Sequence, residues 1–534
     1  MVNITVTTIM RVPENKRYHR ILFPAACSAA TVLLFLSPSS DAAEWRVVPR
    51  LSLVEVYSDN VRLGTASSAS GSGDFITQIN PGMSMNGLGP RFNLRLDYTM
   101  NNLLYAQNSN LTRTRHQLNA IGNAELIEDL FFVDGRATMA QQNLSLTGPQ
   151  SMDNVNVTGN RADVRTYSIS PYLRHRFKDF ATAEVRYSLS QVTSNANALS
   201  NSQGTGYLFG LNSGSAFRTL GWGFNYSNQT VHFDRSNRNA EFERYIATLR
   251  YRVTPQFGLI TTGGYEKNSF LSIRGSPSSP TWSVGFLWTP TERTSIAISG
   301  GQRFFGDTYS ALATHRTRLT AWEVSYDEGL TTFNQQAQFG SMLTMGGSLS
   351  QLLTAQNPGL SPDVIQQNTG AILGLGTSGA FANPSNFLSN RLFLQKRFQA
   401  SVAMNGTRNT LVFRLFNMTR RAFSPESVDV GLGNAADLSL LNHTRQSGGN
   451  GLWSYRISQL TSANLNFGFT RFSYLGADRQ DDMMLFSTGL MRRIPEILPD
   501  LVGTLQVRHN RRTSSQAGAN YQENAAIATL SMSF

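Results

Sequence analysis

From Trp45 onward, apolar and polar residues alternate with a period of two in one segment after another. In residues 91–100, for example, every second side chain is apolar and those between are polar. The same alternation recurs in residues 181–190, 220–226, 245–253 and 463–469. Because successive side chains of a strand point to opposite faces, each segment presents one apolar and one polar face. The chain is therefore predicted to be all-β.

Length and composition narrow the architecture to a membrane barrel. The chain has 534 residues, of which 40% are hydrophobic and only 15% are charged, against about 25% charged in ordinary globular domains. Beyond the N-terminus no run of about 18 apolar residues occurs, so no membrane helix is expected in the body of the chain. A soluble sandwich or propeller is disfavoured because the alternating segments are about 10–14 residues long and no 40-residue repeat occurs.

Connections of two kinds alternate along the chain. Short turns are predicted at 87–90, 178–179, 254–256, 289–292 and 405–407, and longer polar loops at 143–163 and 227–241. This asymmetry is typical of outer-membrane barrels, which have short periplasmic turns and longer extracellular loops. The segments predict a transmembrane antiparallel β-barrel of about 22 strands, with 18 or 20 also compatible, and an even number puts both termini in the periplasm. The last strand, 524–534, ends on Phe534, which matches the C-terminal recognition signal of outer-membrane assembly machinery.

The N-terminus predicts a secretory signal peptide over residues 1–43. Four basic residues precede an apolar run at 21–36, and small residues follow at 40–43. The single cysteine, Cys27, lies inside this segment, so the mature chain has no thiol chemistry. Residues 44–534 are then one barrel domain, delivered to the outer membrane of a Gram-negative bacterium, with any periplasmic reach supplied by a partner.

The longest irregular segment runs from about residue 332 to 390. Between 333 and 390 the only charged residue is Asp363, which argues against disorder, because disordered segments are rich in charge. We predict that this long extracellular loop folds into the barrel mouth as a constriction or plug. An external cap packed on other loops is the alternative.

The polar faces of the predicted strands carry more arginines than acids. The acids assigned to the lumen are Asp97, Glu125, Asp134 and Glu184. A basic lumen would attract anionic solutes, although pairing of these charges across strands is an equally open interpretation. The predicted pore-lining arginines are Arg95, Arg136, Arg174, Arg176, Arg186, Arg244, Arg250, Arg252, Arg397, Arg414 and Arg508.

No motif in the chain points to catalysis, a metal or a cofactor. No histidine pair has metal-ligand spacing, and neither a nucleophile elbow nor a phosphate-binding loop occurs. We therefore predict no catalytic residue, no metal site and no cofactor, and a protein that is not an enzyme. The acids at 481–482 and 59 are interpreted as solvated loop residues rather than a calcium site. The net charge is +12, but the basic residues are spread singly, which argues against nucleic-acid binding.

Several phrases resemble an outer-membrane barrel family associated with PEP-CTERM systems and exopolysaccharide loci, a family that is largely uncharacterised. They are LSLVEVYSDN at 51–60, DFITQINPG at 74–82, WTPTERT at 288–294, GQRFFG at 301–306 and NRLFLQKR at 390–397. The resemblance covers nearly the whole mature chain. It implies a barrel that works beside surface-polysaccharide machinery, and it assigns no binding residues.

These observations together predict an outer-membrane channel taking part in exopolysaccharide export or surface-polysaccharide assembly. The expected partners are outer-membrane lipid, the outer-membrane assembly machinery, a polysaccharide and periplasmic export proteins. Two alternatives remain open: a general diffusion porin for small solutes, and a structural or adhesive surface protein anchored by its barrel.

Overall fold

Every alternating segment forms a strand of a single sheet. The computed structural model describes residues 44–65, 73–195, 201–234, 238–275, 277–332, 387, 389–429, 435–498 and 500–534. The strands are β1 (Glu44–Ser58), β2 (Asp74–Gly89), β3 (Phe92–Tyr105), β4 (Arg113–Ile127), β5 (Phe131–Asn143), β6 (Arg161–Phe177), β7 (Ala181–Ser194), β8 (Ser202–Ser213), β9 (Leu220–Phe233), β10 (Arg238–Arg252), β11 (Phe257–Ser269), β12 (Ser279–Thr291), β13 (Thr294–Arg303), β14 (Gly306–Arg316), β15 (Thr320–Thr331), β16 (Phe393–Asn405), β17 (Asn409–Ala422), β18 (His443–Arg456), β19 (Thr461–Tyr474), β20 (Arg479–Arg493), β21 (Val502–Ser514) and β22 (Tyr521–Ser533).

Among the described residues, helix occurs only in short segments between strands. They are the 3₁₀ turns η1 (Ser109–Leu111) and η3 (Glu426–Asp429) and the helix α5 (Ala435–Leu440). Within the described ranges, no helix is both long and apolar enough to cross a membrane.

The sheet closes on itself. Each strand pairs antiparallel with the next, and β22 returns to pair with β1 from Arg50↔Ser533 to Ser58↔Ala525. Further bonds secure both ends of this seam: the Phe534 amide donates to the Pro49 carbonyl at 2.9 Å, and the Asn524 side chain donates to the Asp59 carboxylate at 2.7 Å. The predicted antiparallel barrel of about 22 strands is confirmed: the sheet has 22.

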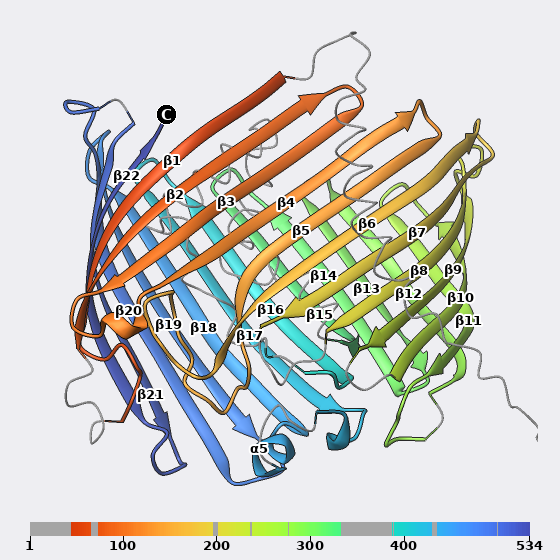
Figure 1. Cartoon of the computed structure of the whole chain (residues 1–534). Helices are drawn as coiled ribbons and strands as arrows, with labels where there is room; N and C mark the ends of the chain where they lie inside the picture. The colour runs from red at the N-terminus through yellow and green to blue at the C-terminus, as the bar shows by residue number, and fades with distance from the viewer. Residues whose placement is uncertain are drawn as a thin grey trace, which may run out of the picture.

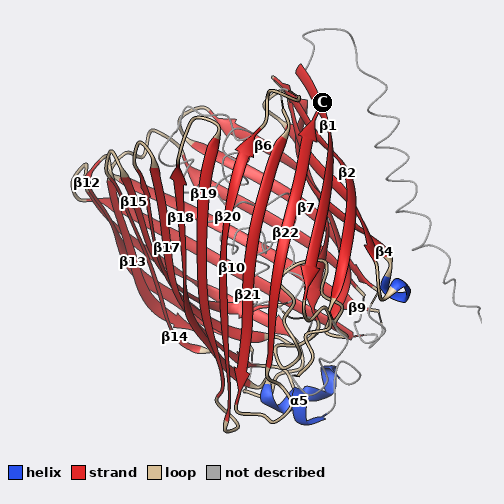
Figure 2. Ribbon diagram, turned by 90° about the vertical axis from the view of Figure 1, so that its left-hand side faces the viewer, coloured by secondary structure: helices blue, strands red, loops and turns tan. Residues whose placement is uncertain are grey.

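The two ends of the barrel differ, as Figures 1 and 2 show. At the end where β1 begins and β22 ends, which we call the turn side, connections are short, from 90–91 between β2 and β3 to 494–501 between β20 and β21. At the opposite end, the loop side, the connections include 144–160, 332–392 and 423–442, and α5 lies there. The predicted alternation is correct for the longest connections, whereas the loop-side connections 234–237 and 304–305 are as short as the turns.

The strand register keeps alternate side chains on the same face from one strand to the next, so the whole barrel has one polar face and one apolar face. Asp97 lies opposite Ser84 and Asn119, and its neighbour Leu96 lies opposite Met85. The face shared by Asp97 is the inner one, since it holds the deeply buried polar side chains near the loop side. The outer face carries most of the exposed large apolar side chains.

Aromatic side chains mark the turn-side edge of the outer face, as interfacial aromatics do in membrane barrels. Five of the six tryptophans point outward near the turn side, and Trp282 lies near the loop-side end of β12. These five are Trp45, Trp222, Trp288, Trp322 and Trp453, and outward tyrosines that include Tyr187, Tyr207, Tyr226, Tyr245 and Tyr265 lie farther along their strands.

Some sequence-based expectations need correction or fall outside the described residues. The loop predicted at 227–241 is wrong, because β9 continues to Phe233 and β10 begins at Arg238. These strands extend past the apolar band, where the outer face becomes polar while Val231, Phe233 and Ala240 pack together on the inner face, so the usual contrast between the faces is reversed. The predicted signal peptide, 1–43, and residues 333–386 and 388 of the predicted plug lie outside the described residues.

The two faces predict opposite tolerance to charge. Leu415 on the outer face and Leu312 on the inner face both lie mid-strand and are 61% and 48% exposed. An arginine facing mid-bilayer lipid costs about 2–4 kcal/mol, whereas one facing a water-filled lumen costs far less. We expect Leu415→Arg to lower the free energy of unfolding by about 2–4 kcal/mol and Leu312→Arg by under about 1 kcal/mol. Denaturant titration in phosphatidylcholine vesicles measures both, and equal losses would contradict the assignment of the faces.

Candidate functional site: a pinned inner loop and a basic lumen

The connection between β5 and β6, residues 144–160, is a compact loop that we call the inner loop. Within this loop, side-chain amides of Asn and Gln donate the hydrogen bonds to backbone carbonyls that strand pairing would otherwise supply. The Asn160 Nδ2 donates to the carbonyls of Ser145 and Pro149 at 2.8 and 3.1 Å, and the Gln150 Nε2 donates to Ser145 and Gly148. The turn is tight, since a Cβ at Gly148 would lie 2.5 Å from the Asn160 side chain. The loop therefore has a defined shape.

One end of the inner loop binds the inner face of β19–β22. Arg512 donates to the Thr147 carbonyl at 3.0 Å and to Asp481 at 2.6 Å. The Tyr474 hydroxyl donates to the Leu146 carbonyl at 3.0 Å, and the Tyr521 hydroxyl donates to Gln150 at 3.1 Å. These strands lie on the far side of β1–β4 from β5, so the loop reaches across the inside of the barrel mouth.

A buried charged cluster holds the middle of the inner loop. Arg508 on β21 lies between Asp153 of the loop and Glu523 of β22, and it bonds the Glu523 oxygens at 3.1 and 3.2 Å. Asn156 of the loop and Ser58 of β1 also donate to Glu523, at 2.7 and 2.8 Å. Glu523 and Asn156 are fully buried. Because buried charges are tolerated only when they are paired and hydrogen-bonded, this cluster selects one docked position.

Apolar contacts complete the docking. Val155 of the loop packs with Val56, Ile76 and Leu103 on the inner face of β1–β3. The Tyr105 hydroxyl donates to the Val155 carbonyl at 2.6 Å. The inner loop thus occupies part of the loop-side mouth, which sequence reasoning missed: it placed the constriction in 332–390. The apolar residues of this loop, Leu144, Leu146, Met152, Val155 and Val157, were the available signal.

The predicted pore-lining arginines share one face. The register places the following side chains on the inner face: Arg95, Arg136, Arg174, Arg176, Arg186, Arg244, Arg250, Arg252, Arg397, Arg414 and Arg508. That they line a conducting path stays a prediction. Phe534, the predicted assembly signal, directly follows β22 in phase with the outward Leu530 and is 66% exposed.

Part of this inner charge is neutralised across strands. Arg174 and Arg186 share Glu184 at 2.7 and 3.0 Å, and Arg186 also reaches Asp134. Other inner-face pairs are Arg244 and Arg303 with Glu266, and Arg397 with Asp327. Pairing of inner charges, one of the two open interpretations, therefore applies to these arginines, and attraction of anionic solutes stays a prediction.

Several inward arginines lie at the inner rim of the turn side without a neutralising acid among the described residues. The side chains of Arg176, Arg250 and Arg252 are exposed there, and none forms an ion pair with another described residue. Arg46, Arg456 and Arg493, which sequence reasoning did not select, lie on the same face near the same end. Glu44 and Glu125 lie on the inner face at this end as well, but the arginines outnumber them, and an excess of positive charge on low-dielectric walls concentrates counter-ions at this entrance.

A second buried acid holds the start of β16. Asp429 in η3 accepts hydrogen bonds from the Ser389 hydroxyl at 2.6 Å and from the Asn390 amide at 2.7 Å. The neighbouring Arg391 is buried and donates to the carbonyls of Ser424 and Leu438. Burial raises the pKa of Asp429 to about 6, against the opposing effect of these hydrogen bonds and of Arg391.

Acids that the sequence suggested were solvated have structural partners. Asp481 is fully buried against Arg512 and Arg479, and Asp59 binds Asn524 at the seam. Within the described part of the chain, no group of three or more potential metal ligands comes together.

Comparison with known proteins gives the fold. No protein-family model and no curated protein matches the chain. Among solved structures, it is similar to the FrpB iron transporter from Neisseria meningitidis, at 10% identity and a TM-score of 0.50, over 93% of this chain and 84% of that one. It is also similar to the siderophore receptor PirA from Pseudomonas aeruginosa, at 10% identity and a TM-score of 0.43, over 93% of this chain and 81% of that one. The chain is thus a closed 22-strand barrel of the outer-membrane type.

Removing the loop's contacts with the charged cluster should release the inner loop while the strands of the barrel wall stay unchanged. Asp153→Asn combined with Asn156→Ala removes the loop's bonds to Arg508 and Glu523, which we expect to cost about 3 kcal/mol of docking free energy. The expected result is new protease cleavage within 144–160 and a larger single-channel conductance. Asp163→Asn, just beyond the loop, is the control, and an unchanged double variant would show that the loop does not close the mouth.

Docking of Ser389–Arg391 should depend on pH. Because the pKa of Asp429 is about 6 in the folded protein and about 3.9 in an unfolded chain, the docked form binds the proton more tightly. Its stability is greatest below about pH 4 and falls as the pH rises through about 6. After correction for intrinsic rates, we expect hydrogen exchange of the Asn390 amide to be faster at about pH 7.5 than at about pH 5. Asp429→Asn should abolish this difference in exchange rate. If the variant kept the pH dependence of the unmodified protein, Asp429 would not be the group that controls docking.

Proposed function

We propose that the protein is a gated channel of a Gram-negative outer membrane that takes part in exopolysaccharide export. The single observation that carries the proposal is the asymmetry of the lumen: an unneutralised arginine rim at the turn side leads toward a loop pinned inside the opposite mouth. In outer-membrane barrels the short turns face the periplasm. In that orientation the basic rim faces the source of an exported polymer, and the inner loop faces the outside.

The chemistry of the rim supports an anionic cargo. Guanidinium groups such as Arg176 and Arg250 bind carboxylates and phosphates in two-point geometry, and acidic polysaccharides carry such groups at regular intervals. Several weak contacts along a rim hold a polymer without trapping it. A cleaved signal peptide, an association with a PEP-CTERM system and periplasmic export partners belong to the same proposal and rest on the sequence.

The gate supports export over free diffusion. A general porin keeps its path open, whereas here Asp153 and Asn156 tie the inner loop to two buried wall residues. A periplasmic partner or the arriving polymer would then supply the free energy that undocks the loop. The fold neighbours are an iron transporter and a siderophore receptor, and at 10% identity their cargo is not carried over to this chain.

Ion selectivity tests the role of the rim. We expect the purified protein in a planar bilayer to prefer anions by reversal potential, most strongly at low salt, where screening is weak. Replacing Arg176, Arg250 and Arg252 with Gln should reduce that preference severalfold, while Arg165→Gln on the outer face should leave it unchanged. Cation preference in the unmodified protein would refute the proposed anionic cargo.

A deletion strain tests the cargo. Loss of the gene should abolish surface exopolysaccharide while the polymer accumulates in the periplasm, and plasmid-borne wild type should restore secretion. Normal secretion together with liposome swelling in small sugars would instead identify a diffusion porin. Normal secretion without swelling would favour a barrel-anchored surface protein.

A further inference from the structure

The outer wall over β17–β21 carries a concentration of basic side chains near the loop side, which we call the outer basic patch: Arg421, Arg445, Arg471 and Arg511. The register places all four on the lipid-facing surface. Each lies within three residues of the loop-side end of its strand, so they form one band at the edge of the apolar surface. Neighbouring strands lie about 4.8 Å apart, so the patch spans roughly 20 Å.

The charge of the patch is largely uncompensated. Arg421, Arg445 and Arg511 are exposed, and their side chains have no hydrogen-bond or ion-pair partner among the described residues. Arg471 binds Asp482 at 2.8 and 2.9 Å, the one acid on the outer face of these five strands. Three positive charges therefore face the membrane edge without a counter-ion among the described residues.

Elsewhere near the loop side, outward basic residues are fewer and mostly neutralised. Lys267 lies 3.5 Å from Glu243, and Lys396 lies 3.2 Å from Glu328, while Arg165 on β6 is a single exposed arginine. An excess of basic residues needed only to mark the membrane boundary would be spread evenly around the barrel. Its concentration on β17–β21 points to a ligand with a localised negative charge.

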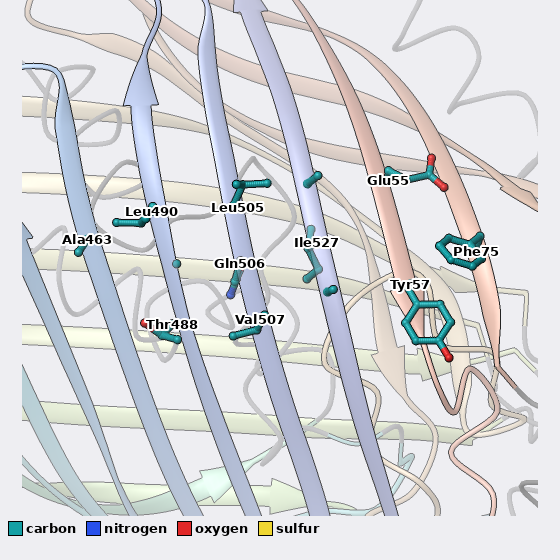
Figure 3. Close-up of a pocket in the computed structure, with 13 residues that line it drawn as sticks. Glu55, Tyr57, Phe75, Ala463, Thr488, Leu490, Leu505, Gln506, Val507 and Ile527 are labelled. Carbon is teal, nitrogen blue, oxygen red and sulfur yellow. The ribbon is translucent and has the colours of Figure 1, made fainter.

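An apolar groove of about 560 Å³ lies in the outer wall next to the patch. Small side chains on β22, Ala526 and Ala528, lie between Leu505 and Val507 of β21 on one side and Tyr57 of β1 on the other. Figure 3 shows the flanking side chains on neighbouring strands. The hollow therefore arises where alanines interrupt a wall of larger residues.

Patch and groove are connected along one strand. On β21 the outward series runs from Arg511 through His509 to Val507 and Leu505, so the guanidinium and the groove are about 13 Å apart along the chain. On the far side of the groove Glu55 accepts a hydrogen bond from Thr77 at 2.7 Å, and its carboxylate repels an anion there. A ligand with an anionic head and an apolar tail is thus oriented in one direction.

We propose that the outer wall binds a phosphorylated membrane lipid, with its phosphate at the outer basic patch and an acyl chain in the groove. Arginine suits this role because its planar guanidinium binds phosphate oxygens in pairs and is more weakly hydrated than lysine. Basic clusters at a membrane edge recognise anionic head groups in the same way. The inference depends on the outer-face geometry and is independent of the proposed export function.

Native mass spectrometry of the full barrel in a non-ionic detergent tests the head-group contact. With dimyristoyl phosphatidic acid and dimyristoyl phosphatidylcholine as probes, we expect retention of the first over the second. Arg445→Gln with Arg511→Gln should weaken phosphatidic acid binding about thirtyfold. The matched control, Arg165→Gln with Lys267→Gln, removes two outward charges from other strands and should leave binding unchanged. If the control variant lost as much phosphatidic acid binding as the Arg445→Gln, Arg511→Gln variant, the effect would be one of overall charge, and the proposed lipid site would be wrong.

A groove variant tests the acyl-chain contact separately. Ala528→Phe should fill the hollow and weaken binding of dimyristoyl phosphatidic acid severalfold, while binding of the short-chain dihexanoyl form stays unchanged. Complete competition by inorganic phosphate, with no effect of Ala528→Phe, would reduce the site to an ion-binding surface and overturn the lipid assignment. Heat-modifiable gel mobility confirms that each variant is a folded barrel before binding is compared.

Discussion

The pairing of β22 with β1 is the interaction on which the rest of the structure depends. In a bilayer an unpaired backbone N–H or C=O group costs several kcal/mol, and the edge of an open sheet exposes a row of them. Closure at the seam removes both edges, with the Phe534 amide and the Asn524–Asp59 bonds extending the pairing to its two ends. The seam joins the most distant parts of the described chain, so it forms only when all the intervening hairpins are in register.

Closure also separates an inner from an outer environment, and the same residue type makes different contacts in the two. Arg508 points inward, where it is buried and must be matched by Glu523 and Asp153. Arg511 lies three residues along the same strand and points outward, where it faces the membrane edge with no side-chain partner in the described part of the chain. The period of the strand, rather than local composition, thus decides whether an arginine pins a loop or presents charge to a lipid.

The interior is asymmetric along the barrel axis as well. Near the loop side, apolar clusters around Leu146 and Val155 and the Glu523 cluster occupy part of the mouth. Near the turn side, inward arginines such as Arg176 and Arg252 are exposed. The hydrogen-bonded wall permits this division, because side-chain contacts hold the inner loop against strands that are already fully paired. Stability resides in the wall and function in the segments that the wall positions.

The sequence by itself determined the barrel. Period-two segments, alternating turns and the closing strand at 524–534 are local signals, and each survived comparison with the structure because strand pairing follows directly from them. It also assigned all eleven predicted arginines to the inner face, since side-chain parity within a strand is a local property. Tertiary structure alone decided which of them are neutralised, because the partners of Arg508 come from 153 and 523, far apart in the chain. It likewise decided that residues 144–160 enter the mouth, and that Ala526 and Ala528 leave a groove beside Tyr57. These features depend on which strands the closed sheet brings together, and no periodicity within a single segment records that.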